Sequence, residues 1–150
     1  MAKFEPINRH IVVDRERFLL VLYQRPEGTY RFKRFLHYRV AIGQTGYETP
    51  RGLYLINTRV KYPDWLVPNS QWALDAGLVP GTIIEGGSEY NPLKERWLGV
   101  TDPIDGVGIH GTAARDSIKT PASHGCIRML EEDIVELYDE VPKYTPIYII

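Results

Sequence analysis

The chain has 150 residues, of which 43% are hydrophobic and 25% are charged, a composition typical of a folded globular domain and unlike that of a disordered chain. Eighteen basic and nineteen acidic residues give a net charge of −1, so the overall balance offers no electrostatic case for nucleic acid or an anionic membrane surface. No apolar run approaches the ~18 residues of a membrane-spanning helix. We therefore expect a single domain over residues 1–150, with no nucleic-acid partner and no transmembrane segment.

The first sixty residues alternate β-rich runs with turns. Residues 11–13 and 18–23 are apolar and flank four charged residues, which predicts a hairpin. Residues 30–41 alternate large and polar side chains and predict a half-exposed strand, and residues 53–57 predict another. The N-terminus lacks the apolar stretch of a secretory signal peptide.

Residues 59–91 show a weaker pattern, broken by several prolines and glycines. Trp65 and Trp72 lie within this span. Long irregular segments in compact domains are often functional, so we interpret this one as a candidate flap that faces substrate. The alternative is that the two tryptophans only anchor a loop to the core.

The second half of the chain predicts two strands, a loop, a helix and a last strand. Residues 97–100 and 107–110 are the strands, with His110 at the C-terminal end of the second, and residues 113–122 are the loop. Apolar residues at helical spacing predict a helix over about 130–141, with acidic residues in its first turn, and Pro142 stops it. Residues 146–150 predict a final strand. The fold class we expect is mainly β, with one substantial helix.

Cys126 is the only cysteine, so it forms no disulfide within the chain. A free thiol has a pKa near 8.5, so nucleophilic use requires a group that accepts its proton. His110 lies sixteen residues upstream and His124 only two residues before it, and spacing alone does not decide between them. Arg128 adds a nearby positive charge, and the amino end of the predicted helix would face the thiolate.

Gly125 precedes the cysteine and adds a second element of the same chemistry. Acyl transfer needs hydrogen-bond donors aimed at the oxygen that becomes negative in the tetrahedral intermediate. Backbone N–H groups in a tight turn provide such donors, and glycine permits the turn and a close approach of substrate. The pattern indicates a cysteine acyltransferase.

Three other interpretations compete with this one. Cys126 could be an inert buried residue, since lone cysteines often pack in apolar surroundings. His110, His124 and Cys126 could hold zinc, although no second cysteine or Cys-x-x-Cys pair is present to complete the site. His110 could do no more than make hydrogen bonds at the end of its strand.

Two segments of the chain resemble the signature of L,D-transpeptidase catalytic domains of the YkuD family. They are residues 109–112 (Ile-His-Gly-Thr) and residues 123–129 (Ser-His-Gly-Cys-Ile-Arg-Met). Residues 40–43 followed by the Thr-Pro-x-Gly turn at 49–52, and the stretch 91–98, also resemble that family. The resemblance covers residues 11–150 and implies a β-sandwich-type domain in bacterial cell-wall chemistry.

The resemblance implies a role for each residue of the signature. Cys126 attacks the carbonyl of the third residue of a peptidoglycan stem peptide and releases the terminal D-alanine, and the thioester then passes to an amine of another stem. His110 is the base, oriented by the carbonyl of Gly111. Gly125 and Cys126 supply oxyanion N–H groups. Ser123 and His124 support the site, and Ser123 and Arg128 are the expected substrate-binding residues, Arg128 toward a carboxylate.

The family also implies no metal or organic cofactor, susceptibility to carbapenems, and a place in the cell envelope. Three alternatives stay open for the chain itself. Water could resolve the same acyl-enzyme, which would make the protein an L,D-carboxypeptidase, or the lysine side chain of a protein could take the place of the second stem. The domain could also bind peptidoglycan without catalysis, but the intact signature argues against this, because binding alone needs no nucleophile.

Overall fold

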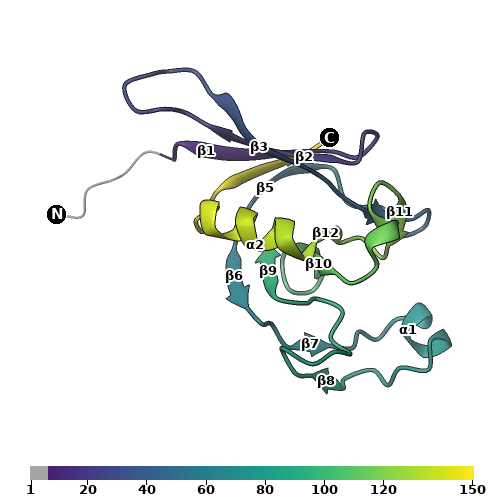
Figure 1. Ribbon diagram of the computed structural model, residues 1–150. Helices are drawn as coiled ribbons and strands as arrows, with labels where there is room; N and C mark the ends of the chain where they lie inside the picture. The colour runs from purple at the N-terminus through teal and green to yellow at the C-terminus, as the bar shows by residue number, and fades with distance from the viewer. Residues whose placement is uncertain (1–6) are drawn as a thin grey trace.

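The computed structural model describes residues 7–150, in which two β-sheets enclose the helix α2 (Glu131–Glu140) (Figure 1). The larger sheet has five strands in the order β3-β2-β1-β13-β5. Its strands are β1 (Arg9–Asp14), β2 (Leu19–Gln24), β3 (Lys33–Arg39), β5 (Gly52–Leu55) and β13 (Pro146–Ile149). β1 and β13 are parallel and the other neighbours are antiparallel.

The second sheet has four strands in the order β12-β10-β9-β6. Its strands are β6 (Thr58–Lys61), β9 (Arg96–Gly99), β10 (Gly108–Thr112) and β12 (Ile127–Leu130). Only the β10–β12 pair is parallel, and β12 leads directly into α2. This pair places the candidate site, because β10 carries His110 and β12 follows Cys126.

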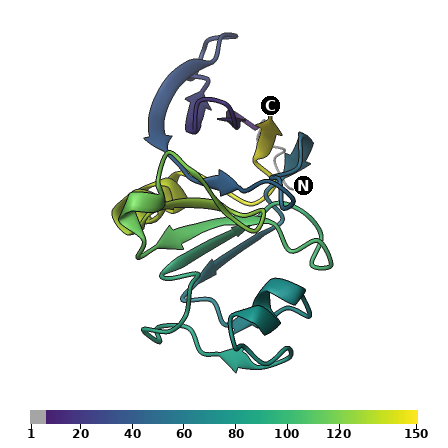
Figure 2. The ribbon, with the colours of Figure 1, turned by 90° about the vertical axis from the view of Figure 1, so that its right-hand side faces the viewer.

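Two short ribbons complete the fold. One pairs β4 (Ile42–Gly43) with β11 (Pro121–Ser123), and the other pairs β7 (Trp65–Leu66) with β8 (Ile83–Ile84). The helical turn α1 (Gln71–Asp75) lies between β7 and β8, and the 3₁₀ turn η1 (Arg115–Ser117) lies between β10 and β11. In both views the β7–α1–β8 segment lies on the opposite side of the four-stranded sheet from the five-stranded sheet (Figures 1 and 2).

The core lies between the sheets and around α2. Alternate residues of β1 and β12 are buried, as the period of two in a strand requires. Ile134 and Leu137 of α2 are fully buried against them. The fully buried large side chains that join the two sheets and α2 are Ile11, Leu20, Leu22, Leu98, Ile109, Ile127, Met129, Ile134, Leu137, Ile147 and Ile149.

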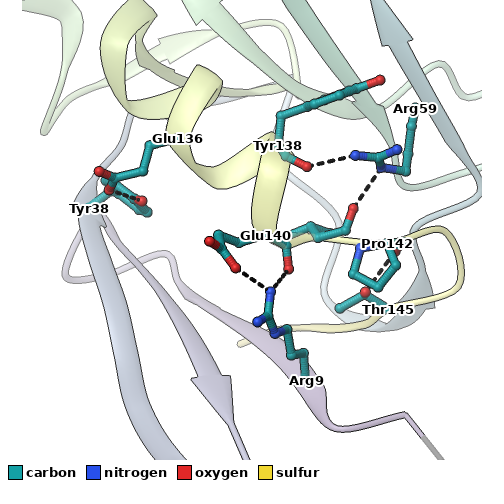
Figure 3. Close-up of polar contacts among 9 residues, drawn as sticks. Arg9, Tyr38, Arg59, Glu136, Tyr138, Glu140, Pro142 and Thr145 are labelled. Carbon is teal, nitrogen blue, oxygen red and sulfur yellow. Dashed lines mark hydrogen bonds and ion pairs between the residues drawn. The ribbon is translucent and has the colours of Figure 1, made fainter. Parts of the chain in front are cut away.

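Polar contacts tie α2 to both sheets (Figure 3). The side chain of Arg59, from β6, donates to the carbonyls of Tyr138 (2.8 Å) and Val141 (2.7 Å) at the helix end. A positive charge there is favourable because the last carbonyls of a helix lack partners within it. On the other side of α2, Tyr38 donates to Glu136 (2.5 Å) and Arg9 pairs with Glu140 (2.5 Å).

The structure confirms the mainly β fold with one substantial helix, but it corrects three details. His110 is the third of the five residues of β10, so the prediction that it ends its strand is wrong. Residues 59–91 are more regular than predicted, with three short strands and α1. The helix begins where it was expected, but the four residues of β12 place the amino end of α2 roughly 13 Å of extended chain beyond Cys126, too far to face the thiolate.

Candidate active site

The register between β10 and β12 brings the candidate residues to one face of the sheet. His110 lies opposite Arg128, and Ile109 opposite Ile127, in this parallel pair. Cys126 directly precedes β12, so it lies on the same face as Arg128, two residues later. Residues paired across neighbouring strands share a face, so His110 is on this face too.

His110 is 5% exposed and is held in a defined orientation. Its Nδ1 lies 2.6 Å from the carbonyl oxygen of Gly111. Because a carbonyl only accepts, Nδ1 carries the hydrogen and donates, which leaves Nε2 as the proton acceptor of the neutral ring. Burial lowers the pKa of His110 to about 4, while the Gly111 carbonyl raises it and Arg128 lowers it further. The imidazole is therefore neutral at pH 7.

Trp97 forms the back of the histidine site, a role that the sequence did not indicate. It lies opposite His110 on β9, with its ring stacked 6.1 Å from the imidazole at 16°. The same indole covers Gly108, where an added Cβ would lie 2.5 Å from two ring carbons. Glycine at 108 therefore lets the indole lie flat against β10.

The thiol of Cys126 is half-buried, and its Sγ lies 3.6 Å from the carbonyl oxygen of Gly106. Burial raises the pKa of this thiol, while a backbone hydrogen bond from Gly108 and the charge of Arg128 lower it. Burial is the largest effect, so the pKa lies above its ordinary value. The resting pair is thus a neutral thiol and a neutral imidazole.

The turn before Cys126 is fixed by two buried hydroxyls. Ser123 donates to the carbonyl of Cys126 (2.5 Å) and accepts from the N–H of Gly125 (3.1 Å). Thr49 donates to the carbonyl of Gly125 (2.8 Å) and accepts from the N–H of Gly43 (2.9 Å). Gly125 has φ +124°, a conformation that favours glycine. Thr49 belongs to the Thr-Pro-x-Gly turn, which is the only sequence signal for its role.

These contacts change what is expected of Gly125 and Ser123. The N–H of Gly125 is occupied by Ser123, so this group is not free in the resting turn to serve as an oxyanion donor. The N–H of Cys126 donates to no acceptor within residues 7–150, so it is the free donor of the expected pair. Ser123 is 1% exposed, and its hydroxyl already serves the turn rather than an open surface.

His124 is exposed and contacts two aromatic rings from other parts of the chain. Its imidazole stacks on Trp72 of α1, with ring centroids 3.9 Å apart at 3°, and meets Tyr47 edge-on at 5.0 Å. Burial and the charge of Arg128 lower its pKa. Trp65 lies behind Trp72, at 6.5 Å and 23°. Trp72 thus lies against His124, two residues before Cys126, and Trp65 packs behind Trp72 rather than in the core.

Arg128 lines a groove of about 300 Å³ beside the site. Within residues 7–150 its guanidinium forms no ion pair and no side-chain hydrogen bond. The groove is lined by Glu89, Tyr90, Asn91, Pro92, Lys94, Thr112, Ala113, Ala114 and Arg128. A half-buried arginine without a carboxylate partner suits an anionic group of a ligand.

Asn91 fixes the wall of this groove. Its side chain is fully buried, and its amide nitrogen lies within hydrogen-bonding distance of the carbonyls of Pro63 (2.8 Å), Ile84 (3.1 Å) and Glu85 (3.2 Å). Its amide oxygen accepts from the N–H of Leu93 (2.9 Å). One side chain therefore holds the two ends of the flap together, which the sequence pattern did not reveal.

A metal site is not formed by these residues. Across residues 7–150, no three His, Cys, Asp or Glu side chains are grouped so as to hold a metal ion. His124 is stacked between aromatic neighbours instead.

Within residues 7–150, no helix is both long and apolar enough to cross a bilayer.

Fold and site together are those of an enzyme domain built around one cysteine and one buried histidine. The family model described as "L,D-transpeptidase catalytic domain" (YkuD) matches residues 8–149. The chain belongs to this family, which confirms the prediction made from the two sequence segments.

Known relatives agree with this assignment. The putative L,D-transpeptidase YqjB of Bacillus subtilis is 35% identical over 75% of this chain and 57% of its own length. The probable L,D-transpeptidase ErfK/SrfK of Escherichia coli is 29% identical over 97% of this chain and 45% of its own length. The chain thus spans about half the length of these relatives.

Solved structures show the same fold. L,D-transpeptidase 3 of Mycobacterium tuberculosis, in complex with a faropenem-derived adduct, has a TM-score of 0.68 at 16% identity and covers 95% of this chain and 60% of its own. The Enterococcus faecium L,D-transpeptidase has a TM-score of 0.66 at 24% identity and covers 95% of this chain and 50% of its own. At these identities the likeness concerns the fold alone.

Proposed function

We propose that the chain is a cysteine L,D-transpeptidase that acts on peptidoglycan stem peptides through a thioester on Cys126. One observation carries the proposal. The β10–β12 register puts a neutral imidazole, with Nε2 free to accept, on the same face as the chain's single thiol. Family membership supplies the substrate class.

The proposed first half-reaction acylates the enzyme. Nε2 of His110 takes the proton of the Cys126 thiol as Sγ attacks the carbonyl of the third stem residue. The N–H of Cys126 stabilises the developing oxyanion. The amide bond then breaks, and the departing amine of the terminal D-alanine takes the proton from the imidazolium. The Sγ–C bond of the thioester remains.

The second half-reaction reverses these roles. An amine of another stem attacks the thioester carbonyl and gives a proton to His110, which returns it to the departing sulfur. The product is a cross-link between two third residues, and the thiol is regenerated. Water in place of the amine would give the carboxypeptidase, so the acceptor decides between the two outcomes.

The other residues of the motif position the reacting groups in this proposal. Ser123 and Thr49 hold the cysteine turn, which keeps the N–H of Cys126 directed at the substrate. Arg128 binds a substrate carboxylate in the groove. His124 supports the flap through Trp72 rather than acting as the base. The site of action that follows from this substrate is the extracytoplasmic cell envelope.

Acylation by a carbapenem tests the proposal. Intact-mass measurement after incubation with imipenem is expected to show one adduct on the wild-type chain and none on Cys126→Ala. His110→Ala should acylate at least ~100-fold more slowly, since general-base catalysis contributes roughly that much. His37→Ala, an exposed histidine on β3, is the matched control and should acylate normally. Full-rate acylation of His110→Ala would remove His110 as the base.

A further inference from the structure

The hairpin formed by β2 and β3 projects beyond the rest of the molecule in both views (Figures 1 and 2). We call residues 25–39 the basic hairpin. It contains five arginine or lysine residues and one acidic residue, Glu27. Every residue from 27 to 35 is exposed. The basic side chains are Arg25, Arg31, Lys33, Arg34 and Arg39.

The positive charge of the basic hairpin is not neutralised by the fold. Within residues 7–150, Arg31, Lys33 and Arg34 form no ion pair with a carboxylate. Arg25 lies over the ring of Phe32 (5.9 Å) instead. The guanidinium and ammonium groups therefore face solvent and attract anions.

Exposed aromatic rings accompany these charges. Tyr30 at the tip is 96% exposed, Phe35 is 43% exposed and Phe32 is 39% exposed. The ring of Phe32 meets His10 of β1 edge-on at 4.4 Å. Phe32 therefore connects the tip to the outer face of the five-stranded sheet, whereas Tyr30 makes little contact with the fold.

That outer face continues the apolar surface. The register places Leu53, Tyr148 and Val12 in one row across β5, β13 and β1. Their neighbours along β13 and β1 are buried toward α2, so this row faces away from the helix. Leu53 is 61% exposed, Tyr148 42%, and Leu55 on the same face 48%.

The overall charge of −1 conceals a division between two parts of the chain. Residues 7–55 carry nine of the eighteen basic side chains but only four of the nineteen acidic ones. Four of the five strands of the larger sheet lie in this range. The absence of an electrostatic case for an anionic surface, inferred from net charge, thus does not hold for this face.

We propose that the basic hairpin and the outer face of the five-stranded sheet dock onto an anionic phospholipid bilayer. Basic side chains contact headgroup phosphates, and the exposed tyrosine, phenylalanine and leucine side chains enter the interface, where amphipathic rings are stabilised. A soluble polyanion would use the charges but would leave the aromatic tip and the leucines in water. Docked in this way, the sheet that holds His110 and Cys126 lies on the far side of α2 from the lipid.

Co-sedimentation with vesicles tests the proposal independently of any catalytic activity. The full chain should bind vesicles that contain about one-third phosphatidylglycerol, bind pure phosphatidylcholine far more weakly, and dissociate at high salt. Each basic side chain near such a surface contributes about fivefold to partitioning. Arg31→Gln/Lys33→Gln should therefore partition about 25-fold more weakly, and Tyr30→Ala several-fold more weakly.

The matched control removes the same charge elsewhere on the surface. Lys61→Gln/Lys119→Gln, two exposed lysines outside the hairpin, should change partitioning less than twofold. The melting temperature of each variant verifies that the fold is intact. The proposal would be overturned if both double variants lost the same fraction of vesicle binding. It would also be overturned if the chain bound both lipids equally or bound neither. Binding to soluble polyphosphate but not to vesicles would also overturn it.

Discussion

His110 and Cys126 are both uncharged in the resting site, and this determines how the proton moves. Burial raises the pKa of the thiol and lowers that of the imidazole to about 4. A preformed thiolate–imidazolium pair is therefore disfavoured at pH 7. In the proposed mechanism the thiol gives up its proton as it attacks, and the orientation that Gly111 imposes on the ring leaves Nε2 available to accept it.

The pH dependence of acylation follows from this state. Protonated His110 has no lone pair to accept the thiol proton, so acylation falls as the pH drops through the pKa of His110. Imipenem acylation rates should therefore stay nearly constant from pH 7 to about 5, be half-maximal near pH 4, and fall below it. A midpoint near 6.5 would indicate a solvated imidazole and contradict the buried geometry.

Gly125 tests the geometry of the cysteine turn. Its φ of +124° is strained for any residue with a Cβ, although an added Cβ would meet no atom closer than 3.6 Å. Gly125→Ala should therefore destabilise the fold by about 1–3 kcal/mol and slow acylation strongly. Gly77 also has a positive φ, +77°, with open space around it. Gly77→Ala should therefore lose a similar amount of stability but acylate at the wild-type rate. Equal acylation by both variants would show that the turn does not position Cys126.

At the scale of elements, the flap of residues 59–91 is attached to the site by an aromatic contact. Trp72 of α1 stacks on His124, and Asn91 fixes the base of the flap. Trp72→Ala should raise hydrogen–deuterium exchange in residues 71–91 and slow acylation several-fold, because the groove wall loses its support. Leu74→Ala, on the same helical turn and 50% exposed, should do neither. Unchanged exchange in Trp72→Ala would refute the anchoring role of this stack.

Elements with a local pattern could be predicted from the sequence, and those set by distant contacts could not. The apolar spacing of Ile134 and Leu137 indicated α2, and the Ser-His-Gly-Cys motif indicated Cys126 as the candidate nucleophile. The middle position of His110 in β10 depends on pairing with β9 and β12, which no local pattern encodes. Trp97 likewise reaches the site only through that pairing. Residues 59–91 looked irregular because their strands are two to four residues long and one buried asparagine clamps the segment.

At the scale of the whole molecule, α2 joins the two sheets into one core. Leu137 is fully buried between them. Leu137→Ala should lower the free energy of unfolding by about 2–5 kcal/mol, since it leaves a cavity in the core. Leu74→Ala, which removes a half-exposed side chain, should cost less than about 1 kcal/mol.

The described residues share one core, so the chain should unfold in one step. Tryptophan fluorescence and far-UV circular dichroism should report one shared denaturant transition, and two separate transitions would contradict a single domain.

The exposed positive charge of the basic hairpin lies on the opposite side of the molecule from the candidate site. The basic, aromatic face of the five-stranded sheet and the site on the four-stranded sheet lie on opposite sides of α2. If the basic, aromatic face binds lipid, the site on the four-stranded sheet faces away from the bilayer. This arrangement relates the two proposals in space, although each has its own test.

The most direct test of the central claim follows a stem peptide itself. The chain would be incubated with a disaccharide-tetrapeptide, and the products and the protein would be analysed by mass spectrometry. We predict release of D-alanine, a thioester adduct on Cys126 and a cross-linked dimer, all absent with Cys126→Ala. Tripeptide without dimer would indicate hydrolysis of the same acyl-enzyme. D-alanine release by Cys126→Ala at the wild-type rate would contradict the account.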